Sequence, residues 1–506
     1  MTYTHDSEQA NAKLPAIDAR NEDLAVATCQ AWKALQEANR RRPQLFRHGE
    51  IVRIELGDQG VPVLREMTVD RMRHALARCA RYFRLSSSTR LPVAPPLPVV
   101  RDLLASPNPP LPVLTRIVEA PVFAPDGTLQ TGPGYHAASR TFYYPAPDFQ
   151  LPAVPEKPTE DELMRARSLI LDELLCDFPF MSFTERTHAV ALLLLPYVRN
   201  LIDGPTPLHL IEKPSPGTGA TLLVDSLTYP ATGRPAAAMA EGRDEDEWRK
   251  RITAKIADGS QIVLIDNLRH RLDSAALSAA ITSRFWEDRR LGHSEMILLS
   301  VECIWIATGN NPALSLELAR RTVRIRLDAR SDRPWLREGF RHADLRRWIA
   351  GHRAELVWAA LVVIRRWLAE GRPESPNPTR LGMFESWSRI LGGILHTAAF
   401  AGFLGNLDDF YSQSDSEGEV WRSFISSWSE RFGERPVTAG ELYDLAELLD
   451  LGSGSERSQR TRLGKLLGSA RDRQFGGLRI EKGGVAHGLQ RWRLARILAD
   501  GGTSRT

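Results

Sequence analysis

The sequence has few cysteines and no long apolar run. Only four of its 506 residues are cysteines: Cys29, Cys79, Cys176 and Cys303. They lie far apart without a C-x-x-C spacing, which excludes a cysteine-based zinc site and a disulfide framework and favours a reducing cytoplasm. The longest apolar runs, 189–195 and 356–364, are too short to span a bilayer, and residues 1–10 lack a signal-peptide core. We therefore expect a cytoplasmic protein without a membrane partner.

A large excess of one charge is also missing. The chain has 66 Lys and Arg against 62 Asp and Glu, a net charge of +4. This balance permits contact with nucleic acid without requiring it, so local clusters have to decide. The hydrophobic content of 42% and charged content of 25% are typical of globular proteins, and the length allows several domains.

A nucleotide-binding loop is present in outline but lacks its lysine. The phosphate-binding pattern is G-x-x-x-x-G-K-[ST], and the stretch EKPSPGTGATLLVD at 212–225 follows it with two exceptions. Pro214 stands in place of the first glycine, and Ala220 stands in place of the lysine. The remaining elements of the pattern are Gly217, Thr218, Gly219 and Thr221. The loop is a disabled ATP site, a rewired one, or an ordinary turn.

The surrounding elements follow in the order that a nucleotide site requires. A strand is predicted at 207–212 and a helix from 221, on either side of the loop. The apolar strand QIVLIDNL then ends in Asp266 and Asn267, where a carboxylate holds Mg²⁺ in nucleotide sites. A further strand ends in Asn310, at the carboxyl edge where ligands of α/β sheets bind. The remaining candidates are Arg320 and Arg321, before a strand in which we expect Arg324 and Arg326 to point outward.

These residues carry a family resemblance. Residues 207–330 resemble the AAA+ core of superfamily III-type helicases, and the stretch EDRRLGHSEMILLSVECIWIATGNNPALSLELARRTVRIRL is similar to the primase-helicases of phages, integrative elements and poxviruses. The resemblance implies ATP and Mg²⁺ as cofactors, Asp266 and Asn267 as the Walker B pair, and Asn310 as sensor 1. It also implies that Arg320 or Arg321 is an arginine finger for the neighbouring subunit of a ring. Thr221 and Asp266 are the implied metal ligands.

Two residues depart from that family. It usually has lysine at the position of Ala220 and an acidic residue at the position of Asn267. A hydrogen bond to a charged group contributes roughly 1.5–3 kcal/mol, so losing the lysine weakens phosphate binding by about 10- to 150-fold. Lys213 either replaces the missing cation or is a surface lysine beside a turn.

Two further segments are candidates for contact with DNA. SRFWEDRRLGHSEMILL predicts a hairpin with Gly292 near its tip, and the resemblance implies that Arg289, Arg290 and His293 grip single-stranded DNA in a central pore. The alternative is an ion-pair cluster with Glu287 and Asp288. In the tail, residues 431–497 have 13 Lys and Arg against 8 Asp and Glu, a local net charge of +5.

The tail pattern of two helices and a hairpin around a Gly-Gly turn predicts a winged helix. Its basic residues lie on the second helix and the wing, which face duplex DNA in such modules. They are Arg457, Arg460, Arg462, Lys465, Arg479, Lys482, Arg491 and Arg493. A winged helix that contacts only proteins is the alternative.

The predicted architecture is an α/β AAA+ P-loop core with N-terminal helical and β accessory segments and a C-terminal winged helix. The four predicted regions are a helical region at 1–84, a Pro/Gly-rich linker with a small β module at 85–157, the core at 158–410 and the winged helix at 411–506. The sequence favours an ATP-driven, ring-forming DNA helicase in replication of a mobile element. The alternative is a scaffold that binds nucleotide or DNA without hydrolysis and loads other replication proteins.

Overall fold

The computed structural model describes residues 14–20, 23–57, 60–86, 89–289, 296–376, 378–447, 449–486 and 488–496. The chain divides after Leu407 into two compact units, and each is described by itself. None of the described helices is long and apolar enough to cross a membrane.

The first unit is built around a five-stranded parallel sheet. In spatial order its strands are β13 (Ala238–Met239), β14 (Ile262–Leu268), β17 (Ile304–Asn310), β12 (Leu208–Lys213) and β18 (Thr322–Arg326). The chain runs from β12 to the far edge at β13, returns through β14 and β17, and then crosses to β18 on the other side of β12. The sheet therefore reverses its strand order beside β12, and ligands of such sheets bind at the carboxyl ends of the strands at this point.

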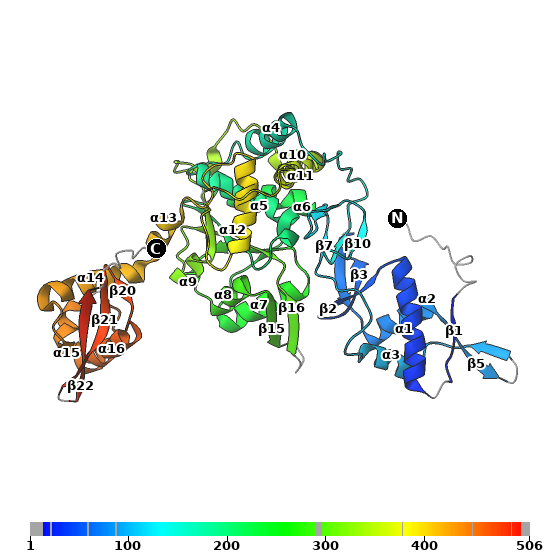
Figure 1. The fold of residues 1–506 in the computed structure, drawn as a ribbon, viewed down its shortest axis with the longest axis horizontal. Coiled ribbons are helices and arrows are strands. Elements are labelled where there is room, and N and C mark those ends of the chain that lie inside the picture. The colour runs from blue at the N-terminus through cyan, green and yellow to red at the C-terminus, as the bar shows by residue number, and fades with distance from the viewer. Residues whose placement is uncertain are drawn as a thin grey trace, which may run out of the picture. The chain divides into compact units, whose positions relative to one another are not determined.

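Helices surround this sheet (Figure 1). They are α4 (Glu160–Ser168), continued by a π-helical segment (Leu169–Leu174), α5 (Phe183–Val198), α6 (Ala220–Thr232), α7 (Glu245–Ala257), α8 (Ala275–Thr282), α9 (Leu316–Ala319), α10 (Leu345–Gly351), α11 (Arg353–Ala369) and α12 (Glu385–Thr397). α5, α6 and α11 pack against one another, and α5 also covers β18. α5 is apolar on nearly every side and almost completely buried, as expected of a helix inside a core.

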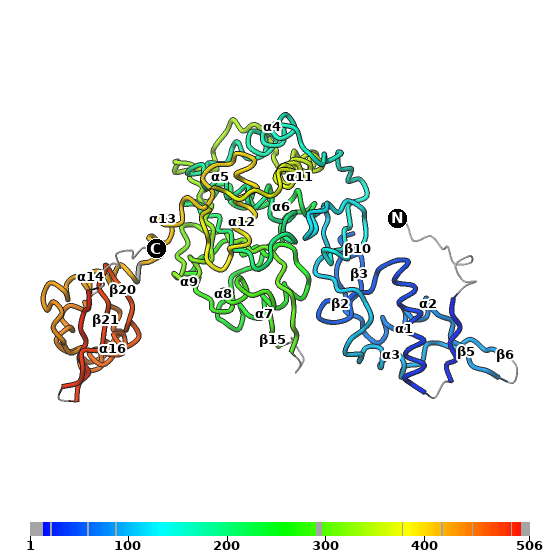
Figure 2. The backbone as a smooth tube through the Cα atoms, in the orientation of Figure 1, coloured from blue at the N-terminus to red at the C-terminus, as the bar shows by residue number. Residues whose placement is uncertain are grey.

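The N-terminal part of this unit combines helices and small sheets. Its helices are α1 (Leu24–Arg41), α2 (Val69–Cys79) and α3 (Leu97–Leu104). Its first sheet contains β1 (Ala16–Asp18), β5 (Arg81–Ser86) and β6 (Thr89–Pro92), of which β5 and β6 form the hairpin seen in Figure 2. Its second sheet contains β2 (Leu45–His48), β3 (Glu50–Leu56) and β4 (Pro62–Glu66). The predicted helical region at 1–84 thus also contains strands.

Five short strands follow before the core. They are β7 (Arg116–Val118), β8 (Val122–Phe123), β9 (Leu129–Gln130), β10 (Gly134–His136) and β11 (Thr141–Tyr143). β7, β10 and β11 form one small sheet, and β8 and β9 form another. Arg116 anchors this part to the core, since its guanidinium is buried and donates to Asn200 Oδ1 at 2.8 Å.

The second unit has helices packed on a four-stranded antiparallel sheet. Its elements are α13 (Leu407–Ser414, whose first residue closes the first unit), α14 (Ser416–Phe432), β19 (Val437–Thr438), α15 (Ala439–Leu442), a 3-10 turn (Tyr443–Leu445), α16 (Glu456–Ser469), β20 (Gln474–Phe475), β21 (Leu478–Ala486) and β22 (Leu489–Arg496). Trp428, Leu463 and Trp492 lie in its core. Because this core is separate from that of the first unit, we treat the two units as distinct modules.

Two details of the tail differ from the sequence interpretation. The predicted helix at 437–449 begins after Thr438, as expected from its capping box with Glu441, but ends at Leu442. The predicted Gly-Gly turn lies inside β21, where the register with β22 shifts between Lys482 and Val485. The hairpin itself is confirmed, and its strands separate beyond Ala486.

Candidate nucleotide site

The loop between β12 and α6 joins a buried strand to a helix, as predicted. β12 ends at Lys213 and α6 begins at Ala220. Gly217 and Gly219 have φ values of +81° and +101°, a left-handed backbone that favours glycine. A Cβ at Gly217 would lie 3.0 Å from that of Trp335, so glycine is also needed for this close packing. Two glycines therefore fix the course of the loop.

The N-terminus of α6 is open to an anion. Gly219 is its N-cap and no side chain caps the first turn, whereas Thr159, Asp244 and Ser274 cap α4, α7 and α8. Free N–H groups and the helix dipole favour negative charge at such an end. Ala220 is buried and brings no charge to this end. The exposed Thr221 makes no hydrogen bond through its hydroxyl to any described residue, which leaves it free for a ligand.

Asp266 is held in place at the carboxyl end of β14. The hydroxyl of Thr308 on β17 donates to Asp266 Oδ1 at 2.6 Å and accepts from the Asn267 N–H at 2.8 Å. Asn267 has a φ of +59°, and the register with β17 shifts between Ile265 and Leu268. The bulge thus turns Asn267 into solvent, while Thr308 orients the carboxylate beside it.

Asn310 lies next to the loop. It is in register with Lys213 across β17 and β12, and the following Asn311 N–H donates to the Lys213 carbonyl at 3.0 Å. The Asn310 side chain is exposed and bonds to no residue in the part of the chain that the structure describes. The sheet therefore brings the loop, Asp266 and Asn310 to one edge.

Lys213 is buried, so the interpretation as a surface lysine is wrong. Its side chain is only 9% exposed. Burial lowers the pKa of Lys213, and the nearby Asp266 carboxylate opposes this effect. Within the described ranges the ammonium makes no hydrogen bond and no ion pair.

Arg320 and Arg321 lie at the opposite end of the sheet from the loop. The Arg321 carbonyl accepts from the N–H of Leu208, at the start of β12. β12 has six residues, so its ends are about 16 Å apart at about 3.3 Å per residue. Arg321 donates to the Glu317 carbonyl at 2.7 Å and pairs with its carboxylate, while the exposed Arg320 has no partner among the described residues. Neither arginine can reach the loop of its own chain.

Arg324 does not point outward as predicted. It is buried on β18, because α5 covers this edge strand. Arg326 pairs with the buried Glu212 of β12. Alternation along the strand is thus not a guide to exposure here.

The predicted hairpin consists of β15 (Phe285–Arg289) and β16 (Met296–Ser300). One face packs on α7, where Trp286 Nε1 donates to Thr253 at 2.9 Å and Arg249 pairs with Asp288 at 3.5 Å. The other face exposes three apolar side chains, Phe285, Met296 and Leu298, by 59%, 63% and 59%. Asp288 therefore faces α7 and does not join an ion-pair cluster at the tip. Arg289 is exposed, while Arg290 and His293 lie outside the described residues.

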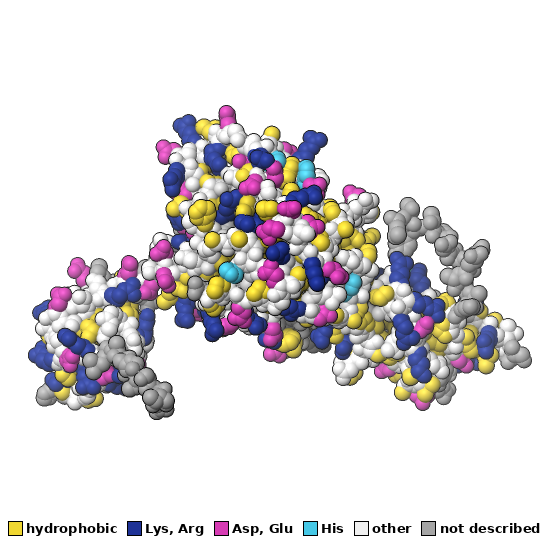
Figure 3. Space-filling view, turned by 45° about the horizontal axis from the view of Figure 1, so that its top comes forward, with side chains coloured by type: hydrophobic (Ala, Val, Ile, Leu, Met, Phe, Trp, Pro, Cys, Tyr) yellow, Lys and Arg dark blue, Asp and Glu magenta, His cyan; other side chains and the backbone are white. Residues whose placement is uncertain are grey.

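The predicted basic residues of the tail divide by their partners. Arg462 donates to the Leu451 and Ser453 carbonyls at 2.6 and 2.8 Å, so it holds a loop of its own unit. Arg479 and Arg493 share Glu481, and Arg460 pairs with Glu456. Arg491 is half-buried. The remaining three are exposed and have no partner within the described residues: Arg457, Lys465 and Lys482. Figure 3 shows dark-blue Lys and Arg side chains on the visible face of this unit.

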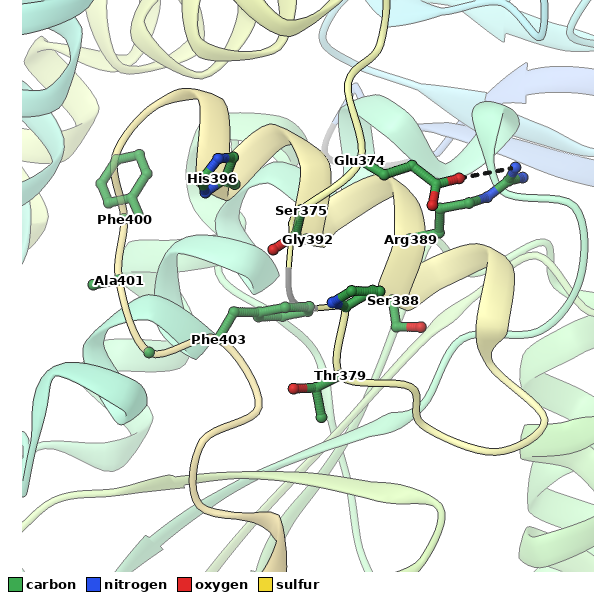
Figure 4. Close-up of a pocket in the computed structure, with 12 residues that line it drawn as sticks. Glu374, Ser375, Thr379, Ser388, Arg389, Gly392, His396, Phe400, Ala401 and Phe403 are labelled. Atoms are coloured by element: carbon green, nitrogen blue, oxygen red, sulfur yellow. Dashed lines mark ion pairs between the residues drawn. The ribbon is translucent and has the colours of Figure 1, made fainter. Parts of the chain in front are cut away.

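A pocket elsewhere in the first unit is a weaker candidate. It has a volume of about 190 Å³ and lies between α12 and two loops, with Phe400 and His396 on one side and Glu374 and Arg389 on the other (Figure 4). Glu374 and Arg389 are 3.9 Å apart and 60% and 59% exposed, so they already neutralise each other in contact with solvent. No buried polar group of this pocket waits for a ligand.

A magnesium nucleotide fits the residues at the loop. The described residues contain no group of three or more His, Cys, Asp and Glu that could hold a metal ion alone. Mg²⁺ is usually bound by one or two protein oxygens together with phosphate oxygens. The Thr221 hydroxyl and the oriented Asp266 carboxylate are donors of this kind.

Comparisons with known proteins give little guidance. No family model and no curated protein matches the sequence. Among solved structures, the apo form of the NrS-1 C-terminal region matches 92% of this chain and 98% of its own, with 10% identity and a TM-score of 0.38. JCV helicase bound to a small molecule matches 54% of this chain and 73% of its own, with 13% identity and a TM-score of 0.18. Such weak likenesses leave the function to be inferred from the site.

Proposed function

We propose that the first unit binds Mg²⁺ and ATP at the carboxyl edge of its sheet and hydrolyses ATP. The observation that carries this proposal is the convergence of three separate segments: the loop with the uncapped α6 N-terminus, the oriented Asp266, and Asn310. A structural turn needs only the first of these. The backbone N–H groups of Gly217 to Thr221 surround the phosphates, and Thr221 and Asp266 hold the metal.

The metal neutralises charge on the phosphates, and the protein supplies the geometry. Thr308 keeps the Asp266 carboxylate aimed at the metal position. Asn310 places its amide beside the end of the loop, where it can orient the terminal phosphate or the attacking water. Asn267 cannot take a proton from water as a carboxylate does, which favours slow hydrolysis.

The experiment compares ATP binding and ATP turnover of the full chain, with and without single-stranded DNA. We expect measurable binding and DNA-stimulated turnover. Asp266→Ala should abolish turnover, whereas the matched control Asp246→Ala on the exposed side of α7 should not change it. If no form binds ATP, the loop is a structural turn and the ATPase proposal is wrong.

We further propose that the chain acts on DNA as a ring-forming, helicase-like protein. The support within the first unit is the position of Arg320, which is exposed, unpaired among the described residues, and able to reach only another subunit's nucleotide. In the second unit the support is the helices, the hairpin and the free Arg457, Lys465 and Lys482, which suit a winged helix on duplex DNA. The sequence resemblance to primase-helicases supports a role in replication of a mobile element.

A scaffold without ATP hydrolysis is the second candidate. Two observations favour it: Ala220 brings no charge to the loop, and Asn267 stands where an acid is usual. Such a scaffold would bind ATP and DNA, anchor replication proteins, and show no turnover above that of Asp266→Ala. Turnover measured with and without DNA separates the two candidates directly.

A further inference from the structure

The loop itself contains no cation for the phosphates. Residues 214–221 include neither Lys nor Arg, and a bound nucleoside triphosphate carries about four negative charges that backbone N–H groups only partly offset. Any cation must therefore reach the loop from an adjacent element. The nearest candidates in the sheet are Lys213, at the end of β12, and Arg326, at the end of β18.

Arg326 is excluded because it is engaged on the other face of the sheet. It pairs with Glu212, and successive residues of a strand point to opposite faces. Lys213 follows Glu212 and therefore points to the face that Arg326 does not serve.

Lys213 shares its face with the other residues of the site. The register pairs Lys213 with Asn310, and two residues earlier it pairs Ile211 with Thr308. Paired residues of parallel strands lie on the same face, and Thr308 binds Asp266 on that face. The electrostatic effect of Asp266 on Lys213 places the ammonium and the carboxylate close together.

The state of Lys213 is unusual for a lysine. Lysines are almost never buried without a partner, yet this side chain is 9% exposed and, within the described residues, has no hydrogen bond and no ion pair. Lys213 therefore brings a charge to the root of the loop that an anion would satisfy.

We propose that Lys213 is the phosphate-binding cation of this site and replaces the lysine that Ala220 lacks. The ammonium approaches from the end of β12 and not from the start of α6, so it meets the phosphates on the side of Asp266 and Asn310. This inference rests on the proposed nucleotide site, which it makes specific for phosphorylated ligands. The competing role is structural: Lys213 only offsets the charge of Asp266.

Magnesium ATP and adenosine are the probes, and binding to the full chain is measured by calorimetry and by competition with a fluorescent ATP analogue. Lys213→Met removes the charge and keeps the apolar stem. We expect it to weaken ATP binding by about 10- to 150-fold, the value of a hydrogen bond to a charged group, and to change adenosine binding less than about twofold. The matched control is Lys250→Met, which removes an exposed lysine from α7.

A relocation variant tests whether the charge itself matters. Lys213→Met combined with Ala220→Lys returns an ammonium to the site from the helix side, and we expect it to recover at least tenfold of the lost affinity. Lys213→Gln provides a second neutral form if the methionine variant does not fold, as judged by thermal unfolding. ATP affinity within twofold of wild type in either folded neutral form would make Lys213 structural and leave the nucleotide site intact. Failure of the wild type to bind ATP would instead overturn the proposed function.

Discussion

The two units use positive charge in opposite ways. In the first, one lysine at the end of β12 is buried without a partner, although its short loop shows no charge excess in the sequence. In the second, eight basic residues make a clear excess, yet Arg460, Arg462, Arg479 and Arg493 have local partners. The comparison shows that the partners and burial of a cation, and not the local net charge, decide whether it is free to bind an anion.

The largest expected effect tests a third cation, Arg320. An arginine finger contributes roughly 10³–10⁵ in rate, so Arg320→Ala should lower DNA-stimulated ATP turnover by at least about a thousandfold. The stability of the chain should not change, because Arg320 has no partner among the described residues. Turnover and urea unfolding of the same preparation check both expectations.

Mixing shows whether Arg320 acts between subunits. Arg320→Ala protein combined with Asp266→Ala protein should regain part of the activity, because an intact Asp266 can then lie beside an intact Arg320 of a neighbouring subunit. Absence of recovery despite demonstrated subunit exchange, together with a small effect of Arg320→Ala alone, would remove the finger role.

The second prediction concerns acid stability, in which the two units should also differ. His188 is fully buried in the first unit; its Nδ1–H donates to the Arg324 carbonyl, and its Nε2 accepts from the Leu404 N–H. Burial lowers the pKa of His188 to about 4. The unfolded chain, with a pKa near 6.5, therefore binds a proton that the folded chain does not, and stability falls as pH decreases from about 6.5 to 4.

The loss from His188 alone should reach about 3 kcal/mol at pH 4, at about 1.4 kcal/mol per pKa unit. His209, whose pKa burial lowers to about 3, adds to it in the same direction. The second unit has no buried histidine within its described residues, so it should keep its stability between pH 6.5 and 4.5. Urea unfolding followed by peptide-resolved hydrogen exchange measures each unit, and His188→Asn should flatten the pH dependence of the first. Equal losses in both units would contradict this assignment.

The third prediction tests the division of the tail residues. Removing three phosphate contacts should reduce the slope of log affinity against log salt by about 2.7, at about 0.9 per contact. We expect this for duplex DNA and the full chain with Arg457, Lys465 and Lys482 changed together to alanine. Arg479→Ala with Arg493→Ala is the control and should change the slope little, because both arginines are held by Glu481.

A tail that serves only protein contacts would show the same salt dependence in wild type and triple variant. Arg462 is not suitable for this test. Its two hydrogen bonds to the loop at 451–453 mean that its removal would disturb the unit itself.

The order of the strands in the candidate site could be predicted from the sequence, because buried parallel strands are continuous apolar runs and their ends are marked by polar residues. Asp266 and Asn310 end such runs, and both lie at the expected edge. The environment of the loop could not be predicted. Trp335 packs on Gly217 from more than a hundred positions away, and the burial of Lys213 depends on neighbouring strands.

Exposure was the other quantity that pattern alone did not give. Arg324 alternates with apolar residues and was expected outside, but α5 covers the edge strand that carries it. The two glycines at 483 and 484 were expected in a turn, yet the cross-strand register continues beyond them after a shift. In both cases the deciding contact comes from another element, which local sequence does not encode.

The smallest expected effect concerns Arg321, the neighbour of the proposed finger. It caps α9 by donating to the Glu317 carbonyl, and a cation at a helix C-terminus contributes about 0.3–1 kcal/mol. Its ion pair with Glu317 adds little, because that carboxylate is largely exposed and screened by solvent. Arg321→Ala should therefore lower the free energy of unfolding by about 0.3–1 kcal/mol in urea and leave ATP turnover within about threefold of wild type. Adjacent arginines would then have separate roles, one in stability and one between subunits. A loss of turnover above tenfold, in a variant that unfolds like the wild type, would transfer the finger role to Arg321.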